Sequence, residues 1–447
     1  MVIYVTLHNY NPYRVDDTWF ASFIYNDYVK NIQVDTVFGG EVTHGMGGTQ
    51  LFGKFYTLTY GSIIDLFLGD WTKANFYTIT IGLLILTSFI WYFILLKLGI
   101  SKIYAIYYVL LILYSYTFFV AAHSVRPEIF ILFWTSLSLL ATLFKKYTLS
   151  ILFAFIAIET HPIGSISLFI NLAVLLEKNY QEDIIKNWQR ILLKVTLALL
   201  ISLSVYLYFH YDYLYKITAI KAASQPFLDV FIYKYYFLST YYRTFPELVL
   251  ILISVYFYIS KGLYKTNSIL LHLFIAVIIF SLLIGRGNVA YAVLLYPIFW
   301  LLIFSLFIHI NQFSLLIALT IVFYLPQYAF LYYRSFHYAD YGKSYRSFLL
   351  ANVPQDNLPV VGFPNDYWSF IDKRDFYHVC YFNPAFFQQN IRMAWLIEPD
   401  LVEFDRFFKH DECDNLQNIT ANYSKQLVKT IYYANKPIKL YKITRKF

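Results

Sequence analysis

The chain has 447 residues, of which 59% are hydrophobic and only 14% are charged, against roughly 25% charged residues in a typical soluble domain. This composition excludes a single soluble core and indicates a membrane protein that crosses the bilayer several times. The formal net charge of +8 does not indicate a nucleic-acid partner, because no basic stripe accompanies a nucleic-acid-binding motif.

Near the N-terminus, the stretch from Arg14 to Trp19 carries two adjacent carboxylates, Asp16 and Asp17. In one interpretation they only cap a helix running to Val29, because a carboxylate accepts hydrogen bonds from the free N–H groups of a first helical turn. In the other they take part in catalysis. The apolar run Met1 to Leu7 is too short for a spanning helix or a signal peptide, so we expect an upstream start.

Apolar runs predict the helices that follow, since a helix needs roughly 20 residues to cross the hydrocarbon core. The stretch Thr49 to Leu68 mixes apolar and small polar residues and predicts a helix lying in the membrane interface. The predicted spans and half-spans are about 74–96, 103–121, 129–144, 149–158, 163–176, 191–209, 248–259, 269–284, 289–308 and 313–332. The two short runs, 149–158 and 163–176, predict a hairpin with Glu159 to Pro162 as its polar tip.

Basic residues give these spans a consistent orientation. The turn between Lys97 and Lys102, the Lys145-Lys146 pair and the segments Lys178 to Lys194 and Lys261 to Lys265 all fall on one face, which the positive-inside rule makes cytoplasmic. The opposite face then receives the acid pair and the remaining polar loops. We therefore predict an all-α polytopic membrane domain over residues 1–333, with about ten or eleven spanning helices and a first outer loop at about 8–73.

The C-terminal segment, residues 334–447, differs in composition. Charged residues return, and Val360 to Phe363 and Leu440 to Ile443 read as short strands. We predict a small α/β domain outside the cytoplasm. Both cysteines, Cys380 and Cys413, lie in it, and we predict a disulfide between them, because disulfides form on the oxidising side of a membrane.

Most of the charged and polar residues that are candidates for a function fall on the predicted non-cytoplasmic face. Charged groups at membrane depth are costly and are retained mainly where they pair, line a cavity or do chemistry. The alternative is that turns are polar everywhere. Besides Asp16 and Asp17, the candidate site residues are His44, His123, Arg126, Glu128, Glu159, His161, Arg243, Arg286 and Asn288.

Arginines beside carboxylates at a membrane surface suit a lipid substrate whose leaving group is a phosphate, because the guanidinium recognises phosphate through two hydrogen bonds. A carboxylate would take the proton from an acceptor hydroxyl as a sugar is transferred. The sequence has no zinc-protease His-Glu-x-x-His, no Gly-x-Ser-x-Gly and no complete Gly-x-x-x-x-Gly-Lys-Ser/Thr phosphate loop, because the partial match from Gly48 to Lys54 is followed by Phe55. Those chemistries are therefore disfavoured.

Five segments resemble one known family: RVDDTWFASFIYNDYV, GTQLFGKFYTLTYG, HSVRPEIFILFWTSLSLLA, ETHPIGSISLFINL and GRGNVAYAVLLYPIF. Together they are similar to the C-type (GT-C) membrane glycosyltransferases that use polyprenyl-phosphate sugars, a group that includes protein O-mannosyltransferases and aminoarabinose transferases acting on lipid A. The similarity covers roughly residues 10–330. It implies an inverting transferase in a bacterial inner membrane, with its site and C-terminal domain outside the cytoplasm.

The resemblance also implies residue roles. Asp16 corresponds to the leading Asp of the family's acidic pair, which is taken as the catalytic base, and Asp17 to its companion. Arg126 and Arg286 correspond to contacts with the donor phosphate, and His161 to a pocket residue. This chain departs from the family in its first helix, which is missing or cut short, and in Asp17, where Glu is commoner. The choice of base between the two carboxylates therefore stays open.

The expected partners are a polyprenyl-phosphate sugar donor, membrane lipid and a glycan, lipid or protein acceptor. The residues point to no definite cofactor, and the one candidate is a divalent cation near Asp16 and Asp17. The alternative function is a polysaccharide polymerase or a flippase for lipid-linked glycans, which would also be polytopic but would not need an acid pair in the first outer loop.

Overall fold

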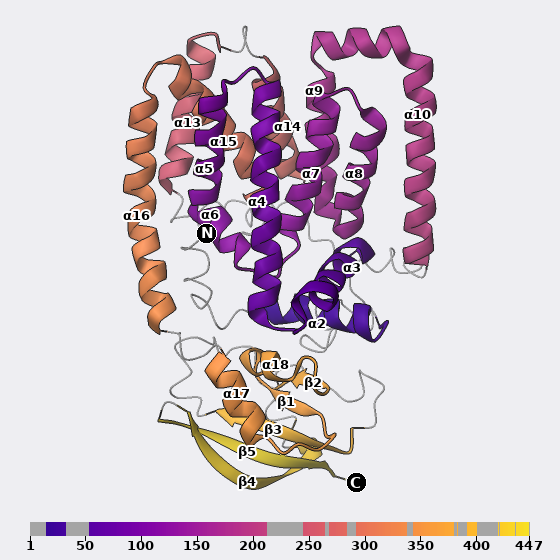
Figure 1. Cartoon of the computed structure of the whole chain (residues 1–447), viewed down its shortest axis with the longest axis vertical. Coiled ribbons are helices and arrows are strands. Elements are labelled where there is room, and N and C mark those ends of the chain that lie inside the picture. Colours follow the sequence, from indigo (N-terminus) through magenta and orange to yellow (C-terminus); the bar gives the residue numbers. More distant parts are fainter. Residues whose placement is uncertain are drawn as a thin grey trace. The chain divides into compact units, whose positions relative to one another are not determined.

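The computed structural model describes residues 15–32, 53–211, 245–263, 268–283, 292–337, 343–379, 382, 391–399, 419, 421–433 and 435–446. The chain forms two compact units (Figure 1). The helical unit comprises Phe52–Tyr56 and Thr80–Ala329, and the mixed unit comprises Met1–Leu51, Thr57–Ile79 and Phe330–Phe447. The two are described separately. The predicted domain boundary after residue 333 stays a prediction.

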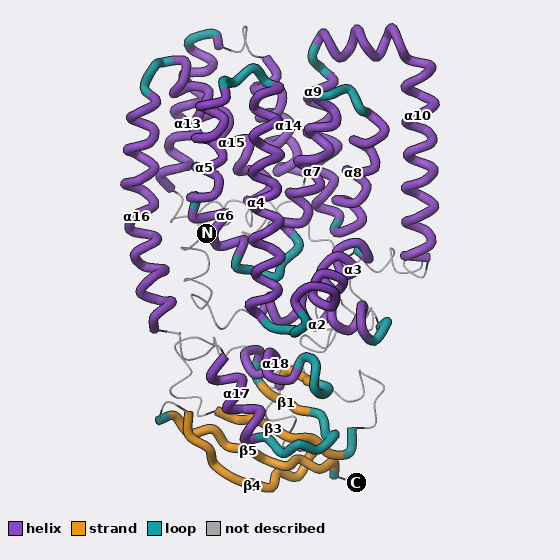
Figure 2. Tube along the Cα trace, in the orientation of Figure 1, coloured by secondary structure: helices purple, strands orange, loops and turns teal. Residues whose placement is uncertain are grey.

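The helices of the helical unit follow the predicted apolar runs closely. They are α4 (Lys73–Lys97), α5 (Lys102–Tyr114), α6 (Tyr116–Ala122), α7 (Glu128–Leu143), α8 (Tyr147–Thr160), the 3₁₀ turn η3 (Pro162–Ser165), α9 (Ile166–Leu175), α10 (Lys178–His210), α13 (Phe245–Ser260), α14 (Ser268–Leu283), α15 (Ala292–His309) and α16 (Phe313–His337). The first residues of α4 and the last of α16 belong to the mixed unit. Figure 2 shows short loops between α4 and α5, between α7 and α8 and between α15 and α16.

Three of the described helices are long and apolar enough to cross a membrane alone: Lys73–Lys97, Lys178–His210 and Phe313–Tyr333. The shorter apolar helices of 10–17 residues include α7, α8 and α14. The predicted polytopic all-α membrane fold is confirmed, and the protein is an integral membrane protein.

The predicted span 103–121 is broken. Helices α5 and α6 meet at Ser115, whose extended backbone (ψ 133°) bends the pair by 58°. The break is tolerated because neighbouring groups bind the polar atoms that it releases. The hydroxyl of Tyr328 donates to the carbonyl of Tyr114 at 2.9 Å, and that of Tyr324 lies 3.3 Å from the Ser115 hydroxyl.

Residues 178–210 form α10, which a kink at Asn187, where φ is −118° and ψ is 18°, divides into two helices. A charged first part followed by a separate apolar helix agrees with the sequence, and the cytoplasmic location of the first part stays a prediction. Figure 1 shows the polar first part running across the end of the unit before the helix turns along the bundle.

The short helices α8 and α9 form the predicted hairpin. A buried polar cluster joins them to α7: Asn171 donates to the hydroxyls of Ser138 at 2.7 Å and Ser150 at 3.0 Å, and Thr142 donates to the Asn171 oxygen at 3.0 Å. Hydrogen bonds between helices hold membrane segments together where lipid offers no partner. This cluster therefore stabilises two helices that are short for full spans.

The mixed unit combines three helical segments with a sheet domain. The helical segments are α2 (Val15–Val29), α3 (Lys54–Ile63, whose first residues belong to the helical unit) and the π-helical turn η2 (Ile64–Leu68). The helix predicted over 49–68 is thus present from Lys54 to Leu68. The sheet domain contains α17 (Lys343–Asn352), β1 (Val360–Gly362), α18 (Pro364–Phe370), β2 (Phe376–His378), β3 (Met393–Pro399), β4 (Tyr423–Tyr433) and β5 (Lys436–Arg445).

The five strands form one sheet in the order β2-β1-β3-β5-β4. Strand β1 is parallel to β2 and β3, whereas β5 is antiparallel to both β3 and β4. The core is apolar and includes Val361, Leu396 and Ile443. Two of the strands were predicted from the sequence, and the small α/β domain is confirmed. Cys380 and Cys413 lie outside the described residues.

Asp366 of α18 is buried in this domain. Its carboxylate accepts hydrogen bonds from the hydroxyl of Tyr345 at 2.7 Å and from the backbone N–H of Phe363 at 2.9 Å. Burial raises the pKa of Asp366 from 3.8 to about 6, and the two hydrogen bonds only partly oppose this rise. The folded domain therefore keeps a proton that the unfolded chain loses near pH 4.

We expect this proton to make stability depend on pH. Below pH 4 both states are protonated. As the pH rises from about 4 to about 6, ionisation favours the unfolded chain, at a cost of about 3 kcal/mol for roughly two pH units. Thermal unfolding of wild type and Asp366→Asn, measured in detergent from pH 4 to 8, should show the variant gaining stability relative to wild type between about pH 4 and about pH 6 and little further change above that. A difference independent of pH would contradict the assignment.

Candidate functional site

The acid pair lies in the first turn of α2, in the mixed unit. The positive end of the helix dipole favours carboxylates at this position. Asp17 is fully buried, and its carboxylate accepts a hydrogen bond from the hydroxyl of Tyr77 at 2.6 Å. The Asp16 side chain lies outside the described residues. The structure thus anchors Asp17 to the first turns of α4.

A second buried carboxylate of α2, Asp27, was missed from the sequence. The Thr57 hydroxyl of α3 donates to it. One turn further along α3, a Cβ on Gly61 would overlap the ring of Tyr28, so only glycine lets the two helices approach this closely. The residue types give no signal for this pairing, because Asp27 and Thr57 are 30 positions apart.

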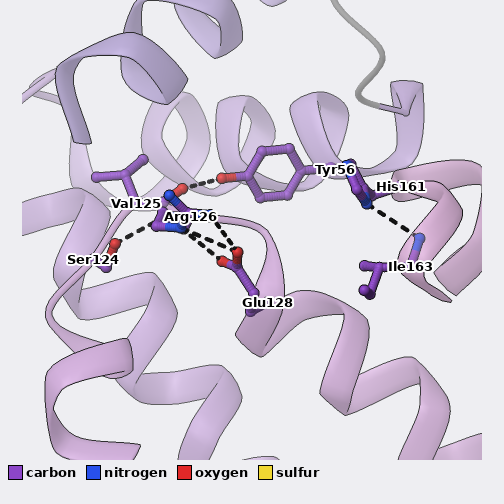
Figure 3. Close-up of polar contacts among 7 residues, drawn as sticks. All are labelled: Tyr56, Ser124, Val125, Arg126, Glu128, His161 and Ile163. Carbon is purple, nitrogen blue, oxygen red and sulfur yellow. Dashed lines mark hydrogen bonds and ion pairs between the residues drawn. The ribbon is translucent and has the colours of Figure 1, made fainter. Parts of the chain in front are cut away.

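In the helical unit, the turn before α7 carries an ion pair that is largely shielded from solvent (Figure 3). The Nε of Arg126 donates to Glu128 Oε1 at 3.0 Å and a terminal nitrogen of the guanidinium donates to the same oxygen at 2.8 Å. The two side chains are only 12% and 3% exposed. Both were candidates from the sequence, and the structure shows that Glu128 fixes the plane of the Arg126 guanidinium.

Backbone hydrogen bonds hold this turn in place. The hydroxyl of Tyr56 donates to the carbonyl of Val125, as Figure 3 shows, and the hydroxyl of Thr80 donates to the carbonyl of Ser124 at 3.2 Å. The Arg126 N–H lies 3.4 Å from the Ser124 hydroxyl. The turn is thereby tied to α3 and α4, which leaves Arg126 little freedom to move.

His161, in the link between α8 and η3, lies near the same turn (Figure 3). Burial and, to a smaller extent, the charge of Arg126 together lower its pKa from 6.5 to about 4. Its Nδ1 accepts a hydrogen bond from the N–H of Ile163 at 3.1 Å. The ring is therefore neutral near pH 7 and carries its proton on Nε2, which makes Nε2 a hydrogen-bond donor.

His123, also a candidate from the sequence, has the surroundings of a core residue. His123 is buried, with its Nδ1 3.0 Å from the carbonyl of Phe119, one turn earlier in the chain. Its ring lies against the Phe119 ring, with centroids 4.3 Å apart. These contacts are typical of a core histidine that holds the end of a helix.

Glu159 has a role that the sequence did not reveal. Its carboxylate accepts from the first N–H groups of α3, those of Lys54 at 2.5 Å and Phe55 at 3.4 Å, and so caps a helix more than 100 positions away. The same carboxylate lies 2.8 Å from Nε2 of His210, at the end of α10. Glu159 therefore joins the ends of three helices.

Gly53 fits directly against this carboxylate. A Cβ at this position would overlap the side-chain and backbone oxygens of Glu159. We expect Gly53→Ala to lower the free energy of unfolding by about 1–3 kcal/mol, as overpacking of a filled site does. The matched control is Gly82→Ala in α4, where a Cβ meets nothing within 4 Å. Thermal unfolding of both variants in detergent checks this; equal effects would contradict it.

The remaining candidates, His44, Arg243, Arg286 and Asn288, lie outside the described residues. Among the described residues there is no group of three or more His, Cys, Asp or Glu side chains able to hold a metal ion. The possible cation near Asp16 and Asp17 stays a prediction.

Comparison with known proteins gives one structural likeness. The structure matches ArnT from Cupriavidus metallidurans, solved by crystallography bound to undecaprenyl phosphate, with a TM-score of 0.55 and 12% sequence identity. The match covers 98% of this chain and 96% of that chain. No protein-family model and no curated protein sequence matches. At this identity the likeness shows the fold, and the predicted GT-C-like fold is confirmed.

Proposed function

We propose that this protein is a membrane glycosyltransferase that moves a sugar from a polyprenyl-phosphate donor to an acceptor hydroxyl outside the cytoplasm, with inversion at the sugar carbon. The main support is the fold, which matches that of ArnT over nearly the full length of both chains. ArnT was solved bound to undecaprenyl phosphate. Acid, arginine and histidine side chains occur at the positions where the resembled family carries its site.

Two features of the helical unit support the proposed donor site. Arg126 has a fixed guanidinium, and His161 has a neutral ring with its proton on Nε2. Both are hydrogen-bond donors suited to a phosphate, and Arg126 adds a positive charge. The second guanidinium in this proposal is that of Arg286. Donors fixed in advance stabilise a phosphate leaving group without reorganisation during the reaction.

In the proposed reaction Asp16 acts as the general base. The acceptor oxygen forms a bond to the anomeric carbon and gives its proton to the Asp16 carboxylate, while the bond from that carbon to the phosphate oxygen breaks and polyprenyl phosphate leaves. Asp17, held by Tyr77 at 2.6 Å, positions the start of α2.

The proposed orientation follows the distribution of lysines. The α4–α5, α7–α8 and α9–α10 connections lie at one end of the helical unit in Figure 1 and carry Lys97, Lys102, Lys145, Lys146 and Lys178. The positive-inside rule assigns that end to the cytoplasm. The turn with Arg126 and Glu128, between α6 and α7, then faces the other side.

The experiment that tests this function is release of polyprenyl phosphate. Purified protein is incubated in detergent or proteoliposomes with a panel of polyprenyl-phosphate sugars and an extract containing glycans and lipids, and free polyprenyl phosphate is measured. A transferase releases it in proportion to the sugar transferred. A flippase moves the donor across the vesicle without breaking it, and that result would replace this proposal.

A further inference from the structure

The helix that carries the acid pair belongs to the same compact unit as the C-terminal sheet domain, although more than 300 residues separate them. Within this unit, α2 packs directly against α18 of the sheet domain. The proposed catalytic base is therefore on a helix whose surroundings are built partly by the C-terminal domain.

One contact between them is an ion pair at the end of α2. Lys30 Nζ lies 2.6 Å from Asp375 Oδ1, and the same ammonium lies over the ring of Tyr25, 5.6 Å from its centroid. Burial raises the pKa of the Tyr25 hydroxyl, and the charges of Asp372 and Asp375 raise it further. The acidic segment after α18 thus faces one side of α2.

A second contact is a row of aromatic rings. Tyr25 of α2 meets Trp71 edge to face, with centroids 4.9 Å apart, and Trp71 lies 5.9 Å from Phe76 of α4. Phe76 in turn meets Trp368 of α18 at 5.7 Å. Trp71, Phe76 and Trp368 are all buried. The rings form a continuous packed path from the sheet domain to the helix with the acid pair.

The sheet domain can serve as a firm support because α18 is itself held. Asp366 accepts from Tyr345 of α17 and from the N–H that precedes the helix. Arg346 of α17 lies 3.4 Å from Asp372, in the acidic segment that follows α18. A displacement of α2 therefore requires movement of α17, α18 and the sheet together.

We infer that the C-terminal α/β domain positions the catalytic helix: Trp368 and Asp375 hold α2 so that its acid pair stays aligned for transfer. This rests on the proposed function and assigns the domain a part in the reaction. The ion pair is 34% and 51% exposed, so it contributes little to global stability. Its effect is on alignment, where a displacement of about 1 Å can cost a factor of about 10² in rate.

The test compares variants in the full-length protein with two measurements, amide hydrogen exchange of residues 15–32 and steady-state transfer kinetics. Trp368→Ala should raise exchange in α2 and lower kcat by about 10-fold while the donor KM changes less than about 2-fold, because a misaligned base acts on the chemical step. Trp368→Phe keeps a ring against Phe76 and should stay close to wild type.

Charge reversal provides a rescue. Lys30→Asp places two carboxylates together, so it should also raise α2 exchange and lower kcat, and the double variant Lys30→Asp with Asp375→Lys should restore both. The matched control reverses Lys425 and Glu398, which pair at 2.9 Å on β4 and β3 within the same domain. Reversing that pair should change neither measurement.

Two results overturn the inference. Unchanged α2 exchange in Trp368→Ala and Lys30→Asp shows that the contacts do not hold the helix, and raised exchange with wild-type kcat shows that holding it does not serve the reaction. Absence of transfer in the wild-type protein contradicts the proposed function, and with it the positioning role. The two failures can be told apart, because hydrogen exchange in α2 is measured without substrate and so tests the contacts even if the wild-type protein transfers no sugar.

Discussion

Asp16→Asn is expected to lower the rate of sugar transfer by about 10²-fold or more. Asparagine keeps the shape of the side chain but cannot take up the proton of the acceptor hydroxyl, and general-base catalysis typically contributes about 10² to 10⁴ in rate. The measurement is polyprenyl phosphate release per enzyme at saturating donor. Asp65→Asn, at an exposed position of η2 in the same unit, is the matched control and should stay at the wild-type rate.

The variant Asp17→Asn distinguishes the roles of the two carboxylates. Because an asparagine oxygen can still accept from the Tyr77 hydroxyl, the loss should be smaller than for Asp16→Asn. Tyr77→Phe removes this hydrogen bond and leaves the Asp17 carboxylate in place, and its loss should also be smaller than that of Asp16→Asn. A larger loss at Asp17 than at Asp16 would exchange their roles, and a wild-type rate in Asp16→Asn would rule it out as the base.

The spanning helices were predictable because the membrane imposes a simple requirement, an apolar run of sufficient length. The run 74–96 became α4 (Lys73–Lys97) with ends that differ by one residue. The break at Ser115 was not predictable, because the hydroxyl that binds the released carbonyl of Tyr114 comes from Tyr328, 214 positions later. Local composition reports whether a segment is apolar, and not which distant side chain lets it bend.

The candidate site shows the same limit. Topology alone placed Arg126, Glu128, Glu159 and His161 on one face, but it did not reveal what each of them binds. Glu128 proved to be the partner of Arg126, and Glu159 proved to cap α3 and to meet His210, 51 positions away. Arg126 and Glu128 are only two positions apart, but their pairing depends on the conformation of the turn that carries them. Glu159 and His210 are too far apart for any helical or strand period to relate them, so only the fold could assign both pairs.

A second large effect is expected at Arg126. In the proposed site its guanidinium holds the donor phosphate while Glu128 fixes its plane through two hydrogen bonds. Lysine is a point charge on a flexible stem, so Arg126→Lys cannot satisfy Glu128 and a phosphate with the same geometry. Loss of one fixed hydrogen-bond donor to a developing charge costs about 10² to 10³ in rate. We expect kcat/KM for the donor to fall by about 10²-fold, and Arg286→Lys to act in the same direction.

The competing explanation is that these arginines only anchor helix ends, in which case lysine would substitute with little loss. Lys97→Arg on the opposite end of the bundle is the control, because the Lys97 ammonium lies over the Phe144 ring at 4.9 Å and arginine stacks there equally well. Donor dependence of turnover is measured for all three variants, alongside thermal unfolding. A fall in kcat/KM without a matching fall in melting temperature places Arg126 at the donor, whereas unchanged kinetics in both arginine variants would remove the phosphate site from the proposal.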